Sequence, residues 1–361
     1  MTQPGHQIAI RCDYSSQIGS GHLFRCLTLA DQLAETGKRV VFVSANPDPR
    51  QTFNLDFPHD WKQMPAPATG HPPGTDDTSG QHAHFLTYPQ AQDAGLFMQA
   101  VAGAPLEWII VDHYGLDRTW HQTCRQTDSR IAVIDDLADR HLDCDLLIDQ
   151  NRTEQSSAVY DHLAPAHCKK LIGPQYAILS AAFRRLHRHQ HPRKSLDHVL
   201  VFFGSSDPSA MVARLMPMIS DMRYSAIQFS VISGALTAAD SGMTSRSNIT
   251  VINHTADIAG LLDQIDLAIG SCGTHSLERA CLGVPAICLP VAENQLQLFK
   301  MLDEVNAIFA VAADHADPVA MIQQHLDTLM DAPMLLENKS RSAYSLTDGT
   351  GAEKIVSCLY A

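Results

Sequence analysis

A titratable side chain follows directly on small residues in the stretch Gly-Ser-Gly-His at positions 19–22. Glycines let a backbone approach a ligand closely, and the apolar stripe that begins at Leu23 predicts a helix here. A helix start attracts phosphate and favours the neutral, basic form of His22. The stretch is neither a Walker A loop, which needs a lysine where His22 stands, nor a dinucleotide fingerprint, which needs a third glycine. It fits a catalytic histidine and, equally, a histidine that only caps or packs.

Carboxylates and a tyrosine follow two apolar runs that predict buried strands. Asp112, His113 and Tyr114 end one run, and Asp135 and Asp136 end another. Because parallel strands end at a common sheet edge, the first three side chains are expected at the mouth of a ligand cleft. Tyr114 either hydrogen-bonds a substrate or buries its ring and leaves its hydroxyl in water. For Asp135 and Asp136 we favour loop capping, or pairing with the next helix, over chemistry.

A second small-residue loop lies within IGSCGTHSLERACLGVPAICLPVAENQ, residues 269–295. The strand expected to end at Gly270 leads into small residues and then a helix that carries Glu278. Backbone N–H groups of such a loop can hold a diphosphate, and a carboxylate such as Glu278 can accept both hydroxyls of a ribose. Glu278 can equally be a charge on the helix surface.

Composition excludes several classes of protein. The chain has 361 residues, which favours two domains, and 45% apolar with 18% charged residues is typical of globular proteins. The 26 Lys and Arg against 39 Asp and Glu give a net charge of −13, and without a basic run this argues against nucleic acid as a partner. No long apolar run or signal-like start is present, so no membrane partner is expected. The nine scattered cysteines indicate reduced thiols and a cytoplasmic location, and the oligomeric state stays open.

Apolar runs alternate with helical spacing in the first half, which predicts a parallel α/β sheet. Strands are expected at residues 8–11 and 40–44 and in runs ending near Asp112, Asp135 and Asn151, the last of which closes this half. The stretch at residues 47–92, rich in Pro, Gly, Thr and His, is expected to be a polar surface insertion. Its irregular histidine spacing argues against a metal site.

The strand rhythm restarts after the basic stretch RRLHRHQHPRK, in HVLVFFG, IQFSVISG, NITVINHT, LAIGSCG and PAICLPV. We therefore expect a first domain at residues 1–180, a linker at 181–195 and a second α/β domain at 196–345. A terminal helix within residues 346–361 is expected to pack back on the first domain. The expected fold class is α/β, with two Rossmann-like, doubly wound domains that face each other across a ligand cleft.

Six strings in the sequence resemble one enzyme family. The most specific are RCDYSSQIGSGHLFRCLTLADQL and IGSCGTHSLERACLGVPAICLPVAENQ. The others are VDHYGLDRTW, IDDLADRHLDCDLLIDQN, GPQYAIL and VFFGSSDPSAM. Together they resemble the UDP-2,4-diacetamido-2,4,6-trideoxy-β-L-altropyranose hydrolases of pseudaminic acid biosynthesis, which are MurG-like UDP-sugar enzymes of GT-B architecture. The likeness covers most of the chain apart from residues 47–92.

The resemblance implies that a UDP-linked diacetamido sugar, a small-molecule substrate, loses UDP to water with inversion at its anomeric carbon. It implies His22 as the catalytic base for water, with no cofactor and no metal ion. The candidate substrate-binding residues are Gly19, Gly21, Arg25, Tyr114, Asn294 and Gln295. The candidate UDP-binding residues are Gly204, Ser205, Gly273, Thr274, His275 and Glu278. One base suffices because a diphosphate leaves with little protonation, unlike the alkoxide of an ordinary glycoside.

Some positions depart from the family pattern, and other functions stay open. The departures are Ser180, Ser205, His275 and Leu277. Arg184 and Arg185 are candidates to replace the arginine that is usual where Ser180 stands. The main alternative is a GT-B glycosyltransferase that uses the same UDP-sugar site. A UDP-sugar epimerase and a non-catalytic UDP-sugar binder also remain.

Overall fold

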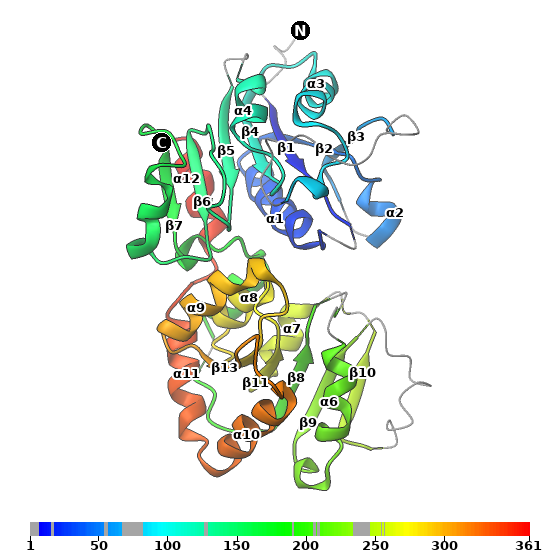
Figure 1. The fold of residues 1–361 in the computed structure, drawn as a ribbon, viewed down its shortest axis with the longest axis vertical. Coiled ribbons are helices and arrows are strands. Elements are labelled where there is room, and N and C mark those ends of the chain that lie inside the picture. The colour runs from blue at the N-terminus through cyan, green and yellow to red at the C-terminus, as the bar shows by residue number, and fades with distance from the viewer. Residues whose placement is uncertain are drawn as a thin grey trace. The chain divides into compact units, whose positions relative to one another are not determined.

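The chain folds into two α/β units, seen in a computed structural model (Figure 1). One unit consists of Met1–Ile178 and Ala352–Ala361, and the other of Leu179–Gly351. The structure describes residues 7–15, 18–53, 57–66, 82–125, 129–189, 191–204, 207, 210–233, 246–253, 255 and 257–361.

A parallel sheet of seven strands forms the first unit, in the order β3-β2-β1-β4-β5-β6-β7. Because the order reverses between β1 and β4, the sheet has its topological switch point there, where open α/β sheets bind ligands. The strands are β1 (Gln7–Cys12), β2 (Arg39–Ser44), β3 (Asp60–Gln63), β4 (Leu106–Asp112), β5 (Arg130–Ile134), β6 (Leu146–Asp149) and β7 (Lys169–Ile172). The helices are α1 (Gly21–Glu35), α2 (Pro49–Phe53), α3 (Gln90–Val101), α4 (Arg118–Cys124) and α12 (Gly351–Leu359), with 3₁₀ turns η1 (Ala83–Phe85), η2 (Glu154–Asp161) and η3 (Pro174–Tyr176).

The central strands of this sheet are buried on both faces, as expected for nearly continuous apolar runs. Ile8 and Ile10 pack on one face with residues of α1 and α12. Ala9 packs on the other face with Phe97 of α3 and Trp120 of α4. Helices on both faces make the sheet doubly wound.

A parallel sheet of six strands forms the second unit, in the order β10-β9-β8-β11-β12-β13, with its switch point between β8 and β11. The strands are β8 (His198–Phe202), β9 (Gln228–Ile232), β10 (Ile249–Ile252), β11 (Leu267–Gly270), β12 (Ala286–Cys288) and β13 (Ile308–Ala310). The helices are α5 (Ala181–His187), α6 (Met211–Ile219), α7 (Ile258–Asp263), α8 (His275–Cys281), α9 (Leu296–Glu304), α10 (Pro318–Asp331) and α11 (Met334–Tyr344), with 3₁₀ turns η4 (Met222–Tyr224) and η5 (Glu293–Gln295).

The strands that the sequence misses are β3, β7 and β13. Each is an edge strand of three or four residues. β3 reads Asp-Trp-Lys-Gln and β7 reads Lys-Lys-Leu-Ile, so neither gives a long apolar run, and β13 has only three residues although it lies within the apolar run at residues 307–313. The run near Asn151 is therefore not the last strand of its half, because β7 follows it. The interpretation of residues 47–92 as an insertion is wrong where α2, η1 and β3 form, since β3 pairs in parallel with β2. Residues 67–81 of that stretch lie outside the described part of the chain.

Both segments that join the units contain a helix. Helix α5, expected in a linker, belongs to the second unit, where Phe183 is buried and His187 Nδ1 lies 2.6 Å from the carbonyl oxygen of Cys281. Helix α12 belongs to the first unit, where the Trp108 indole N–H donates to the carbonyl of Leu359 at 3.1 Å. All nine cysteines are free thiols. Within the described residues, none of the helices has the length and apolar character needed to cross a lipid bilayer.

Candidate functional site

His22 lies in the first turn of α1, just after the turn that closes the β1–α1 loop. The Gly19 N–H donates to the Ser15 carbonyl at 2.8 Å, and Gly19 has φ +83°, a conformation that a side chain would strain. Ser20, which precedes α1, makes no capping bond through its side chain, and the first turn of α1 contains no acidic residue. The start of this fifteen-residue helix therefore keeps the properties that favour a bound anion.

A carboxylate orients the His22 ring. Asp112, at the carboxyl end of β4, places Oδ1 2.5 Å from His22 Nδ1 and is fully buried, while His22 is 6% exposed. The hydrogen bond assigns the proton to Nδ1, which leaves Nε2 as the basic nitrogen. The pair is thus arranged as a general base with its orienting carboxylate.

Arg25 lies one helical turn after His22 and holds the same carboxylate. Its Nε donates to Asp112 Oδ2 at 2.6 Å and its Nη2 to Oδ1 at 2.7 Å, and its Nη1 donates to Asp136 Oδ2 at 2.6 Å. Burial alone would raise the pKa of Asp112, but Arg25 and then His22 hold it well below its ordinary value. Asp112 is therefore ionised, and the two-point contact with Arg25 fixes its orientation.

Tyr114 packs against the catalytic candidate. Its ring meets that of His22 edge to face with centroids 4.5 Å apart, and its hydroxyl donates to Asp136 Oδ2 at 2.8 Å. Burial, and then the charge of Asp136, raise the pKa of Tyr114 well above its ordinary value, so it stays a neutral donor. Of the two expectations for Tyr114, the buried ring is observed, but its hydroxyl is bonded to protein rather than left in water.

The two neighbouring carboxylates that follow β5 behave differently. Asp135 accepts from the Ala138 N–H at 2.8 Å and pairs with Arg140 at 2.7 Å, which is the loop-capping role expected for it. Asp136 instead joins Arg25 and Tyr114, so the same expectation is wrong for Asp136. Its other oxygen, Oδ1, is buried without a hydrogen-bond partner among the described residues.

A further carboxyl, Asp149 at the end of β6, shares one hydroxyl group with Asp135. Tyr160 Oη lies 2.8 Å from Oδ2 of both. A hydroxyl has one hydrogen, so both contacts are hydrogen bonds only if one carboxyl carries a proton. Burial, and then the charge of Asp136, raise the pKa of Asp149 to about 7 even though Arg152 Nε lies 2.8 Å away. Burial also disfavours the charge of Asp135, but the charge of Arg140 outweighs the effect of burial and lowers the pKa of Asp135. Asp149 is therefore the carboxyl that holds the proton.

We expect the wild type to lose stability as pH rises toward 8. Asp149→Asn should not show this loss. A carboxyl with a folded pKa of about 7 and an ordinary unfolded pKa binds its proton more tightly when folded. Its favourable contribution is complete below about pH 4 and is lost as pH rises through about 7, a change of at most about 4 kcal/mol. Asparagine keeps a donor and an acceptor without ionising.

Thermal unfolding midpoints from pH 5 to pH 9 check this expectation. Asp331→Asn, at an exposed position near the end of α10, is the matched control and should follow the wild type. Parallel curves for wild type and Asp149→Asn would contradict the assignment of the proton.

The second unit places its candidate loops after β8 and β11, at the switch point of its sheet. Gly204, which follows β8, has φ +95°, so only glycine is unstrained there. Gly270 ends β11 so close to β8 that a Cβ would lie 2.1 Å from the Phe202 carbonyl oxygen. Ser205 lies outside the described residues. The two loops are therefore neighbours along one sheet edge.

Side chains of α8 and η5 border the loop that follows β11. His275 Nδ1 and Glu278 Oε2 form a close contact, and the rings of His275 and Phe202 have centroids 4.9 Å apart. The side-chain oxygen of Gln295 accepts from the N–H groups of Cys272 at 3.3 Å and Val291 at 3.0 Å. Gln295 thus shapes this loop, a role that differs from the substrate contact expected for it.

The candidate residues fall into two groups. His22, Arg25 and Tyr114 meet in the first unit, next to the turn of Gly19 and Gly21. Gly204, Gly273, Thr274, His275, Glu278, Asn294 and Gln295 lie in or beside the loops of the second unit. The sequence points to Asp112 and Asp136 at strand ends but misses the pairing of Asp112 with His22 and of Asp136 with Arg25. Their positions at the ends of neighbouring strands, opposite the i, i+3 pair on α1, are the signal that identifies them. Within the described residues, no group of three or more His, Cys, Asp or Glu could hold a metal ion.

Comparisons with known proteins reach along most of the chain. No protein-family model matches it. The spore coat polysaccharide biosynthesis protein SpsG of Bacillus subtilis (strain 168) is 21% identical over 286 residues, which cover 77% of this chain and 84% of SpsG. The structure of MurG from Acinetobacter baumannii gives a TM-score of 0.66 at 17% identity, over 98% of this chain and 99% of MurG. UGT2 of Phytolacca americana, in complex with UDP-2fluoro-glucose and pterostilbene, gives a TM-score of 0.68 at 13% identity, over 100% of both chains.

Structural likeness at these identities establishes the fold. The expected class of two Rossmann-like α/β domains is confirmed, with one parallel sheet in each unit. The narrower resemblance to the hydrolases of pseudaminic acid biosynthesis stays a prediction. The chain has the GT-B fold of glycosyltransferases.

Proposed function

We propose that this protein is an enzyme of UDP-sugar metabolism. In this proposal it hydrolyses a UDP-linked 2,4-diacetamido-2,4,6-trideoxy sugar to UDP and the free sugar, as a step in the biosynthesis of pseudaminic acid, a nonulosonic acid. The observation that carries the proposal is the buried His22–Asp112 pair at the switch point of the first sheet, with Nδ1 and Oδ1 2.5 Å apart. The pair supplies the one group that the reaction requires, a base for the attacking oxygen.

His22 acts on water in this mechanism. Nε2 takes a proton as the water oxygen bonds to the anomeric carbon, and the C1–O bond to the diphosphate breaks on the opposite face, which inverts that carbon. Asp112 stabilises the imidazolium that forms, since its low pKa keeps it charged. Arg25 holds Asp112 in place, and the uncapped start of α1 adds a favourable field for anionic substrate groups.

The loops of the second unit are proposed to hold the nucleotide. We propose that Gly204, Gly273 and Thr274 offer backbone N–H groups to phosphate oxygens, and a side chain at Gly204 would strain its loop. Glu278, whose carboxylate is in contact with His275, is proposed to accept the ribose hydroxyls. Asn294 is proposed to contact the sugar.

A glycosyltransferase is the second candidate. The same His22–Asp112 pair would deprotonate an acceptor hydroxyl instead of water, with no other change in the chemistry. The GT-B likeness to MurG and UGT2 favours this candidate as strongly as it favours hydrolysis. The name of SpsG places that protein in the biosynthesis of a spore coat polysaccharide, which is compatible with either role here.

Product analysis separates these functions. The protein is incubated with UDP-diacetamido sugars in ¹⁸O-water, with and without sugar acceptors, and the products are followed by NMR and mass spectrometry. Hydrolysis gives UDP without an acceptor, a free sugar of inverted configuration at early times, and ¹⁸O on the sugar rather than on UDP. UDP release that depends on an acceptor identifies a transferase, an isomeric sugar identifies an epimerase, and binding without turnover identifies a binder.

We expect Glu278→Ala to weaken UDP binding about tenfold or more. Loss of a charge-assisted hydrogen bond typically costs about 1.5–3 kcal/mol, and UDP would lose its ribose contact before any chemistry takes place. Calorimetric titration with UDP measures the affinity, and Glu304→Ala, at an exposed position near the end of α9, is the matched control. Unchanged UDP affinity in Glu278→Ala would refute the proposed ribose contact.

A further inference from the structure

One buried arginine of the second unit has no carboxylate partner. The buried arginines of the described chain are Arg11, Arg25, Arg140, Arg152 and Arg279. Arg11, Arg25 and Arg140 each place a nitrogen within 2.7 Å of an aspartate whose pKa is lowered, and Arg152 lies 2.8 Å from Asp149. Arg279, which is 3% exposed, forms no ion pair with a carboxylate in the described part of the chain. Burying a cation without a counter-ion costs free energy, so an anion that binds near Arg279 would be stabilised by its charge.

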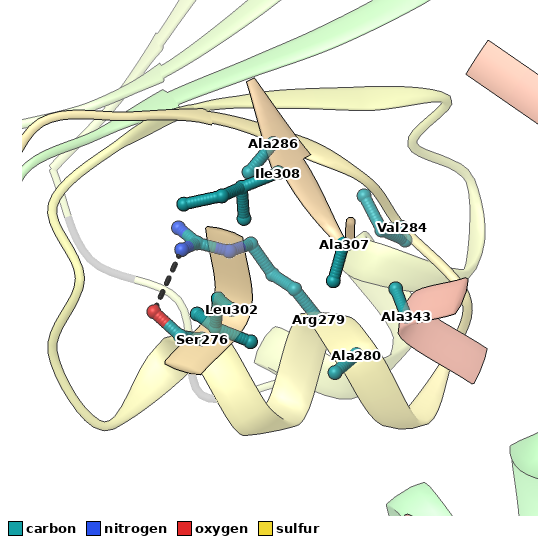
Figure 2. Close-up of a pocket in the computed structure, with 9 residues that line it drawn as sticks. All are labelled: Ser276, Arg279, Ala280, Val284, Ala286, Leu302, Ala307, Ile308 and Ala343. Atoms are coloured by element: carbon teal, nitrogen blue, oxygen red, sulfur yellow. Dashed lines mark hydrogen bonds between the residues drawn. The ribbon is translucent and has the colours of Figure 1, made fainter. Parts of the chain in front are cut away.

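The guanidinium of Arg279 lies beneath the loop that follows β11. From α8 it reaches back to Ser276, and its Nη2 donates to the Ser276 hydroxyl at 2.9 Å and to the Ser271 carbonyl at 3.0 Å (Figure 2). Its Nη1 lies 3.3 Å from where a Cβ on Gly270 would be. A third acceptor is the sulfur of Cys288, at 3.4 Å. Arg279 thus stabilises the loop at residues 271–274 through hydrogen bonds and places a positive charge next to it.

The surroundings of Arg279 leave room for little water. It lines a cavity of about 10 Å³ together with Ala280, Leu302 and Ile308, side chains that are mostly apolar (Figure 2). This volume holds about one water molecule, so it is too small for a ligand. Between charges at low effective dielectric, attraction extends over several ångströms without direct contact.

We propose that Arg279 is the positioning residue that makes the loop at residues 271–274 select for the diphosphate of a nucleotide. The inference rests on the proposed function and deepens it by assigning the source of phosphate selectivity. Arg279 does not touch the ligand. It fixes the loop through Ser271 and Ser276, and its charge is balanced when the diphosphate binds above.

The test compares a charged and an uncharged ligand of the same base and sugar. Calorimetric titrations measure the affinity of the full chain for UDP and for uridine, in the wild type, Arg279→Met and Arg279→Lys. We expect Arg279→Met to weaken UDP binding at least tenfold and uridine binding less than twofold, because methionine keeps the apolar stem without the charge. Arg279→Lys should keep the ratio of the two affinities within about threefold of the wild type.

Each outcome decides the inference. Equal weakening of UDP and uridine in Arg279→Met shows a structural role only, and an unchanged UDP affinity shows no role; either overturns the inference while the proposed function stands. If Arg279→Met does not fold by circular dichroism, Arg279→Gln, which keeps a hydrogen-bond donor without the charge, carries the same comparison, and an unchanged UDP-to-uridine ratio in that variant overturns the inference. A wild type that binds neither UDP nor uridine defeats the proposed function itself.

Discussion

We expect His22→Asn to abolish measurable turnover of the UDP-sugar and to leave the affinity for UDP unchanged. Asparagine removes the basic nitrogen that accepts the proton of the attacking water, and a positioned general base contributes about 10²–10⁴-fold to a rate. We therefore expect kcat to fall by more than about a thousandfold, toward the upper end of that range. UDP affinity should survive, because the residues proposed to hold the nucleotide belong to the other unit.

The measurement pairs UDP release under saturating substrate with calorimetric titration of UDP. His162→Asn, at an exposed histidine that follows η2, is the matched control and should keep the wild-type rate. A kcat within tenfold of the wild type in His22→Asn would remove the histidine from the chemistry, whichever nucleophile the enzyme uses.

Asp112→Asn has the second largest expected effect, a fall in kcat of about a thousandfold. An amide in place of the carboxylate can donate to His22 Nδ1, which selects the wrong tautomer, and it cannot stabilise the imidazolium. The same change breaks the two-point contact with Arg25 in a fully buried place, where loss of one partner costs about 3–5 kcal/mol of stability.

Kinetics and stability together separate these two consequences of Asp112→Asn. The variant is assayed well below its own unfolding midpoint, and Asp60→Asn, at the exposed start of β3, is the control. A KM close to the wild-type value with a greatly lowered kcat is the expected pattern. The pKa of Asp112 is lowered in the folded state, so its contribution to stability is present above about pH 4 and is lost as pH falls below that value. The wild type should therefore lose more stability than the variant in acid. An equal loss in both would contradict the assignment of its charge.

Much of the fold follows from the sequence because its central strands are buried on both faces. The runs around Ile8, Ile109 and Val201 are continuous and apolar, so their length and spacing identify them. Edge strands have partners on one side only and tolerate polar residues, so β3 leaves no such pattern. β13 lies within an apolar run at residues 307–313 but has only three residues. The helices of the catalytic candidate and of Glu278 are placed correctly because each follows a buried strand through a loop of small residues.

The candidate site is harder to predict from the sequence than the fold is. His22 stands out by its local motif, and Tyr114 by the strand that precedes it. The pairing of Asp136 with Arg25 does not stand out, because the two residues are 111 positions apart and only strand order brings them together. Arg279 looks like an ordinary helix charge beside Glu278, and only the course of its side chain shows that it is buried.

The membership of α12 in the first unit has a consequence for synthesis of the protein on the ribosome. Ile355 and Leu359 are fully buried in the same core as Ile8 and Ile110, yet the whole of the second unit is translated before them. The nascent first unit therefore emerges with an apolar face still uncovered, a situation in which chains aggregate or recruit chaperones. A fragment cut at residue 178 would retain that uncovered face permanently, so expression of the isolated amino-terminal half should give insoluble protein unless residues 352–361 are supplied with it.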